Sequence, residues 1–177
     1  PFETAMAALD MDRISNGRFI LGLGASVTAW TKGVFGSPEV KPLTHLRETT
    51  EAVRYIVKNA HKGLEPYRSE YYNADFEALS LTAEPVRDEI PIWIAALREK
   101  ATCLGAEIAD GMIGHPMWSV EWTTEQMAPV FLDSIEKAGR KRADVEVNIW
   151  PWAAPGPDVQ KAIDEARPTI AFYARIK

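Results

Sequence analysis

Strand-like and helix-like segments alternate along this chain, and the alternation restricts its possible folds more than any other feature. Short apolar runs bounded by turn residues are typical of buried strands, whereas apolar residues at every third or fourth position are typical of amphipathic helices. Alternation of the two predicts parallel β/α units in an α/β fold, either an eight-fold barrel or a doubly wound sheet. The expected strands are Arg18–Gly24, Ile92–Ala96, Gly111–Gly114 and Val145–Trp150.

Helical periodicity fills most of the intervals between these strands. The expected helices are Thr4–Ile14, Thr44–Asn59, Lys100–Ala109, Thr124–Ala138, and a last one opened by Pro157 and Asp158. The core positions expected on the first helix are Ala5, Ala8, Leu9 and Asp12, and on the last helix Val159, Ile163, Ile170 and Tyr173. Two intervals differ, because Ala25–Pro42 has no sustained periodicity and Tyr67–Leu81 alternates aromatic and polar residues like a β-hairpin.

Four strands cannot close a barrel. A complete eight-fold barrel takes about 250 residues, and this chain has 177, so we expect strands to be missing on both sides. The start at Pro1 is neither an initiator methionine nor a signal peptide, and Ala171–Lys177 continues a helical pattern without a stop signal. These features indicate an internal fragment. The composition, 46% hydrophobic and 25% charged, is ordinary for a globular protein, so residues 1–177 are expected to form a single domain.

Charge and composition exclude several classes of partner. The net charge of -5 and the pI near 5.3 provide no electrostatic footprint for nucleic acid, and no apolar run approaches the roughly 20 residues that span a membrane. A small-molecule partner is therefore expected. The single cysteine, Cys103, lies in a helical pattern and suits a reducing compartment, the cytoplasm. The three histidines and this cysteine show no ligand spacing, so no metal is expected.

Three turns after predicted strands could contact a ligand. Gly22-Leu23-Gly24 lacks the third glycine of a dinucleotide fingerprint, which would fall at Val27. The small residues Gly24, Ala25 and Ser26 still allow a planar ligand to approach the backbone, and a tight strand-to-loop turn without a ligand is the alternative explanation. Gly114 and His115 follow another strand, and His115 is the candidate acid or base, with packing as the alternative role. His45 and His61 have the pattern of ordinary helix or loop residues.

The third turn leads from a strand into a helix at Ala95, Ala96, Leu97, Arg98 and Lys100. First-turn amides have no intrahelical partner and carry the positive end of the helix dipole, so such a turn can bind phosphate. Arg98 and Lys100 would add positive charge. A solvated helix start whose charges bind nothing is the alternative.

Six aromatic residues lie near the carboxyl ends of predicted strands or in the loops that follow. Active sites of α/β barrels form at that end, and flat side chains suit a ring-shaped ligand, although core packing accounts for most such residues. Trp30 and Trp118 are the better site candidates in the group, which is Trp30, Phe35, Trp118, Trp122, Trp150 and Trp152.

Three of these segments, in this order and spacing, resemble the luciferase-like monooxygenase superfamily, and most closely its deazaflavin-dependent branch of methylenetetrahydromethanopterin reductase-like oxidoreductases. The segments are Ile14–Gly24, Ile90–Ala96, and Gly105–Gly111 with Gly114-His115-Pro116. The resemblance covers nearly the whole chain. It implies a partial (β/α)8 TIM barrel that lacks the N-terminal strands and the C-terminal end.

The resemblance also implies a site. Gly24, Ala25 and Ser26 map to the turn near the cofactor ring, Ala95–Arg98 and Lys100 map to the phosphate side, and Gly114 and His115 map to the adjoining turn. The implied activity is hydride transfer between coenzyme F420 (8-hydroxy-5-deazaflavin) and a small organic substrate, in a protein that is a homodimer at full length. One alternative is an FMN-dependent monooxygenase, and another is a non-catalytic cofactor-binding or structural relative.

Overall fold

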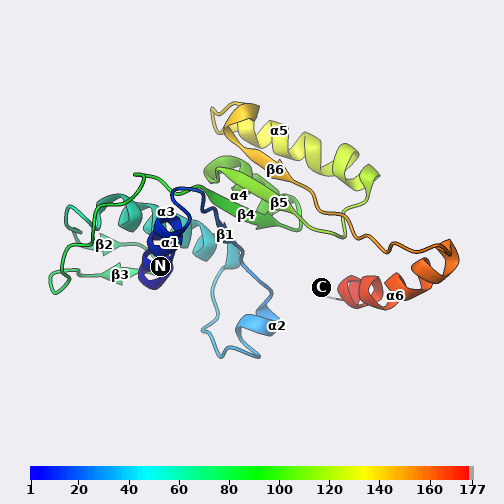
Figure 1. The fold of residues 1–177 in the computed structure, drawn as a ribbon, viewed down its shortest axis with the longest axis horizontal. Helices are drawn as coiled ribbons and strands as arrows, with labels where there is room; N and C mark the ends of the chain where they lie inside the picture. The colour runs from blue at the N-terminus through cyan, green and yellow to red at the C-terminus, as the bar shows by residue number, and fades with distance from the viewer. Residues whose placement is uncertain (176–177) are drawn as a thin grey trace.

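The computed structural model describes residues 1–175 and contains one four-stranded parallel sheet (Figure 1). Its strands lie in the order β1 (Leu21–Leu23), β4 (Ile92–Ala96), β5 (Gly111–Gly114) and β6 (Glu146–Asn148). Leu21 pairs with Ile92, Trp93 with Gly111, and Gly111 with Glu146. All four expected strands are present, although β1 and β6 are shorter than expected. Of the helical pattern expected over Ala171–Lys177, Ile176 and Lys177 lie outside the described residues.

Four helices form a layer against one face of this sheet. They are α1 (Phe2–Ile14), α3 (Pro42–Asn59), α4 (Glu99–Ile108) and α5 (Ala128–Lys137), and each packs against the next. Ile92, Ile94 and Met112 are at most 2% exposed between the sheet and these helices. Full burial of such a side chain contributes about 2 kcal/mol. The expected buried face of α1, Ala5, Ala8, Leu9 and Asp12, is confirmed.

The other face of the sheet is not covered by these helices. The run Arg18–Gly24 has the pattern of a strand buried on both faces, and this expectation is wrong: Gly22 is exposed and its neighbours Leu21 and Leu23 are half-buried. The reason is that the helices pack on one side only. The uncovered face corresponds to the interior of a β/α barrel, where Trp93 of β4 lies against Gly111 of β5.

The connections contain several short elements. The irregular segment after β1 forms one helical turn, α2 (Thr28–Thr31), and the expected hairpin is confirmed in shorter form as β2 (Tyr67–Arg68) and β3 (Asn73–Ala74). A π-helical turn, η1 (Trp122–Met127), precedes α5. The ring of Pro129 would clash with the carbonyl group four residues earlier in a regular helix, which accounts for the wider turn. Gly139 has φ 67° beyond the end of α5, as expected for a C-cap glycine.

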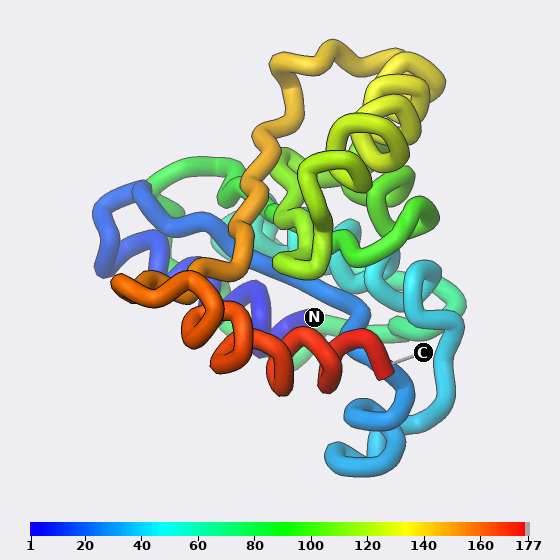
Figure 2. The backbone as a smooth tube through the Cα atoms, turned by 90° about the vertical axis from the view of Figure 1, so that its right-hand side faces the viewer, coloured from blue at the N-terminus to red at the C-terminus, as the bar shows by residue number. Residues whose placement is uncertain are grey.

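Helix α6 (Val159–Arg175) departs from the expected arrangement. Its expected core residues are not buried: Val159, Ile163 and Ile170 are exposed, and Tyr173 is half-buried. An extended, proline-containing segment after β6 carries α6 away from the helical layer (Figure 1), and Figure 2 shows the path of this segment down to α6. The helix therefore has an apolar face but no sheet to cover. No helix within residues 1–175, α6 included, is long and apolar enough to cross a membrane.

Candidate functional site

The carboxyl ends of β1, β4 and β5 open into one cleft of about 880 Å³. Parallel strands end at the same edge of a sheet, so turns that are distant in sequence meet there. All the residues predicted to bind a cofactor line this cleft: Gly24, Ala25, Ser26, Ala95, Ala96, Leu97, Arg98, Lys100, Gly114 and His115. Their role in binding stays a prediction, but the structure brings them together.

The turn between β4 and α4 provides backbone donors. Arg98 is the N-cap of α4, with φ -135° and ψ 170°, and no side chain caps the helix. Its carbonyl oxygen accepts hydrogen bonds from the amides of Ala101 and Thr102, both at 3.0 Å. The amides of the preceding positions are outside the helical hydrogen-bond pattern, and the helix dipole adds positive potential there. This end of the cleft can therefore receive an anion.

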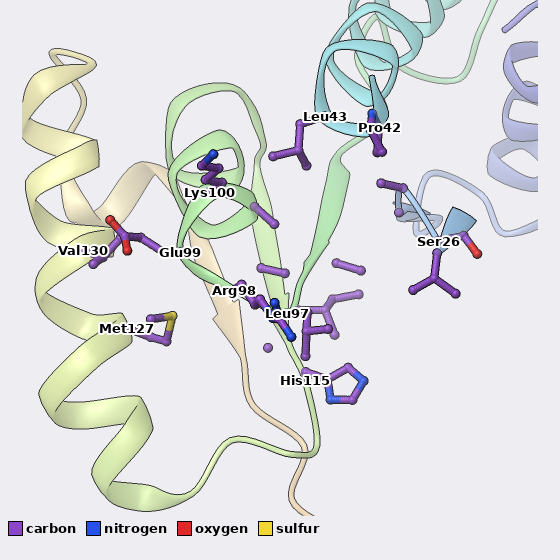
Figure 3. Close-up of a pocket in the computed structure, with 18 of the residues that line it drawn as sticks. Ser26, Pro42, Leu43, Leu97, Arg98, Glu99, Lys100, His115, Met127 and Val130 are labelled. Atoms are coloured by element: carbon purple, nitrogen blue, oxygen red, sulfur yellow. The ribbon is translucent and has the colours of Figure 1, made fainter. Parts of the chain in front are cut away.

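Three charged side chains surround that helix start (Figure 3). Arg98 lies in the middle of the cleft, Glu99 is directed toward Val130 of α5, and Lys100 lies on the side of α4 that faces Leu43. The two cations and the one carboxylate leave the turn with a net positive charge. Because Glu99 points away from Arg98, the arginine is the charge best placed to meet an anion in the cleft.

The turn after β1 combines small residues with an unusual backbone conformation. Ser26 has φ 56°, in the left-handed region, which costs a non-glycine residue about 1 kcal/mol. A side chain at Gly24 would begin 3.3 Å from the Cβ atom of Ala95, so β1 and β4 approach closely here. Strained backbone positions of this kind cluster at ligand sites. The small residues keep this part of the cleft open to a flat group.

The small size of Gly114 is explained by packing rather than by ligand access. A Cβ atom at this position would lie 2.6 Å from Ile149 and 2.8 Å from the ring of Trp118. Trp118 is buried, and its indole nitrogen donates a hydrogen bond to the Leu97 carbonyl oxygen at 2.9 Å. Gly114 therefore makes room for a tryptophan that contacts the neighbouring turn.

His115 lies at the rim of the cleft in a mainly structural setting (Figure 3). Its Nδ1 atom accepts a hydrogen bond from the Met117 amide at 3.2 Å, which leaves the proton of the neutral ring on Nε2. Its ring packs edge-on against Tyr173 of α6 at 5.4 Å. Partial burial lowers the pKa of His115. The ring is therefore neutral at physiological pH and can donate a hydrogen bond from Nε2.

Acidification should weaken the folded state through His115. Because burial lowers its pKa in the folded protein, the unfolded chain binds more protons as the pH falls through about 6.5. This contribution to stability is complete above the pKa that His115 has in the unfolded chain, and it is lost as the pH falls toward the lower pKa that His115 has in the folded protein. Urea unfolding at about pH 7.5 and about pH 5.5 should show a larger decrease in the free energy of unfolding for the wild type than for His115→Asn. The asparagine is chosen because its amide oxygen can still accept the hydrogen bond from the Met117 amide. Equal losses would contradict this assignment.

The aromatic residues that line the cleft are not the ones that the sequence favoured. Trp122 and Trp150 line the cleft, whereas Trp30 does not and is 48% exposed on α2. Trp118 belongs to the core. Loop conformation and the direction of each indole decide these positions, and neither follows from residue spacing. Among residues 1–175, no group of three or more His, Cys, Asp or Glu side chains could hold a metal ion.

The sequence reasoning missed part of the cleft wall. These residues come from the start of α3, the turn before α5, and its first residues: Pro42, Leu43, Gln126, Met127 and Val130. Pro42 at the first turn of α3 could have been found, because helices that follow strands of a barrel start at the same end as the strand termini. The residues of η1 and α5 carried no signal, since Met127 and Val130 have the spacing of an ordinary core face.

Comparison with known proteins identifies the family. Residues 1–177 match the luciferase-like monooxygenase family, and the chain belongs to it. It is 33% identical over 178 residues to an uncharacterized protein of Mycobacterium tuberculosis, covering 98% of this chain and 52% of the relative. It is 29% identical over 173 residues to the 5,10-methylenetetrahydromethanopterin reductase of Archaeoglobus fulgidus, covering 97% and 49%. The chain thus spans about half the length of these curated relatives.

A solved structure confirms the fold. The coenzyme F420-dependent tetrahydromethanopterin reductase from Methanopyrus kandleri matches with a TM-score of 0.77 at 23% identity, covering 98% of this chain and 52% of that one. The parallel sheet and its helical layer are therefore part of a TIM barrel, and not of a doubly wound sheet. The expected family and α/β fold class are both confirmed.

Proposed function

We propose that the cleft holds coenzyme F420 and that the protein transfers a hydride between this deazaflavin and a small organic substrate. The observation that carries the proposal is the meeting of three turns in one cleft: small residues after β1, an uncapped helix start with Arg98 and Lys100 after β4, and His115 after β5. The 32% identity over 187 residues to a putative coenzyme F420-dependent oxidoreductase of Mycobacterium tuberculosis supports a deazaflavin.

The residues present fit such a cofactor. Gly24, Ala25, Ala95 and Ala96 present little side chain, so a planar ring could approach their backbone. The start of α4 and the Arg98 guanidinium could neutralise a phosphate group. When bound, the deazaflavin would supply the hydride chemistry. The chain would bind the phosphate, orient the ring, and offer a hydrogen bond from Nε2 of His115 at the rim.

FMN is the alternative cofactor, because it also carries a phosphate and because the family description names monooxygenases. Purification of the protein, followed by absorption spectra and separate titrations with coenzyme F420 and FMN, distinguishes the two. We expect F420 to bind and FMN to bind more weakly. Tighter binding of FMN would favour the monooxygenase alternative, and binding of neither compound would overturn both.

A further inference from the structure

We propose that Trp118 is a positioning residue that aims the backbone amide of Arg98 at the phosphate of the bound cofactor. The proposal rests on the proposed function. It concerns a side chain that does not line the cleft and acts on the cleft through a single carbonyl group.

The contact between Trp118 and Leu97 joins a buried group to an exposed turn. Trp118 is 7% exposed, whereas Leu97 is 38% exposed at the cleft. The indole nitrogen donates to the Leu97 carbonyl oxygen at 2.9 Å. A buried N–H group needs an acceptor, and this acceptor belongs to the loop between β4 and α4. The core therefore holds the loop in one orientation.

Peptide geometry carries this orientation to the next residue. The Leu97 carbonyl and the Arg98 amide belong to the same trans peptide, so they point in opposite directions. Trp118 packs with Met127 and Phe131 in the core. The Arg98 amide therefore points away from the Trp118 indole, on a residue that itself lines the cleft. The Arg98 carbonyl is fixed as well, by the amides of Ala101 and Thr102.

Gly114 makes the arrangement possible. A Cβ atom there would lie 2.8 Å from the Trp118 ring, so a larger residue would displace the indole. The turn Gly114–Trp118 is also closed by a hydrogen bond from the Trp118 amide to the His115 carbonyl oxygen at 2.9 Å. The end of β5 thus fixes the position of Trp118, and Trp118 fixes the orientation of the peptide between Leu97 and Arg98.

A comparison of two ligands tests this role. Trp118→Phe keeps an aromatic ring but removes the N–H group. We expect its dissociation constant for coenzyme F420 to rise about three- to tenfold, the effect of one lost hydrogen bond. The affinity for 8-hydroxy-5-deazariboflavin, which has the ring but no phosphate, should change less than about twofold. A general disturbance of packing would weaken both ligands alike.

Trp93→Phe is the matched control, because it removes an indole from β4 that packs on Gly111 and does not bond to Leu97. It should leave the ratio of the two affinities unchanged. In the wild type, the Arg98 amide proton should shift on addition of F420 and not on addition of the phosphate-free compound, a measurement that needs no variant. Equal loss of both affinities in Trp118→Phe, or no shift of the Arg98 amide, would overturn the proposal. If the wild type binds neither compound, the proposed function itself is overturned.

Discussion

Replacing Asp12 by alanine is expected to lower the free energy of unfolding by about 3 kcal/mol. The Asp12 carboxylate is 2% exposed, and Arg87 holds it through Nε, 3.1 Å from both oxygens, and Nη2, 2.6 Å from Oδ1. Arg87 also donates to the Phe19 carbonyl oxygen. The pair thus joins α1 to the segments that lead into β1 and β4. Removal of the carboxylate leaves the half-buried guanidinium without its anionic partner, and chemical denaturation measures the lost stability as a lower midpoint.

Two controls separate this pair from ordinary surface charge. Asp10→Ala removes an exposed ion pair with Arg13 at 3.4 Å and should cost less than about 0.5 kcal/mol. The double variant Asp12→Leu/Arg87→Met should recover part of the loss, because it removes both charges. Equal midpoints for Asp12→Ala and Asp10→Ala would contradict the role assigned to the Asp12–Arg87 pair.

Reversal of charge at Arg98 is expected to have the largest effect on cofactor binding. Arg98→Glu should raise the dissociation constant for coenzyme F420 by about ten- to a hundredfold at low salt, because it replaces a charge-assisted hydrogen bond with repulsion. Lys100→Glu should cost less, since Lys100 lies farther from the middle of the cleft (Figure 3). Both effects should shrink at about 1 M salt, where screening is strong.

Lys137→Glu provides a control with the same change in net charge. Lys137 lies in the last turn of α5, at the other end of that helix from the cleft residues Met127 and Val130. Its ion pair with Asp133 is exposed. We expect the affinity for F420 to stay within about twofold of wild type. If Arg98→Glu and Lys137→Glu weaken binding equally, Arg98 does not contact the phosphate.

The unit from Ile92 to Gly114 could be predicted from sequence because its signals are local. An apolar run, a helix start and a second apolar run each have a characteristic pattern, and parallel pairing then places their carboxyl ends together. The gathering of Gly24, Arg98 and His115 in one cleft follows from that rule. The buried face of α1 was predicted by the same local reasoning.

Long-range contacts could not be predicted in this way. The spacing on α1 predicted that Asp12 is buried, but its partner Arg87 lies 75 residues away. The bond from Trp118 to Leu97 depends on the path of a turn. The apolar positions of α6 predicted a core helix, and only the extended path after β6 shows why they are exposed.

Amide hydrogen exchange at single-residue resolution, with and without coenzyme F420, tests the placement of the cofactor most directly. We expect the added cofactor to protect residues 24–26, 95–100 and 114–115, which line the cleft, and to leave the hairpin of β2 and β3 unchanged. Protection that lies elsewhere, in a protein that binds F420, would contradict the assignment of this cleft.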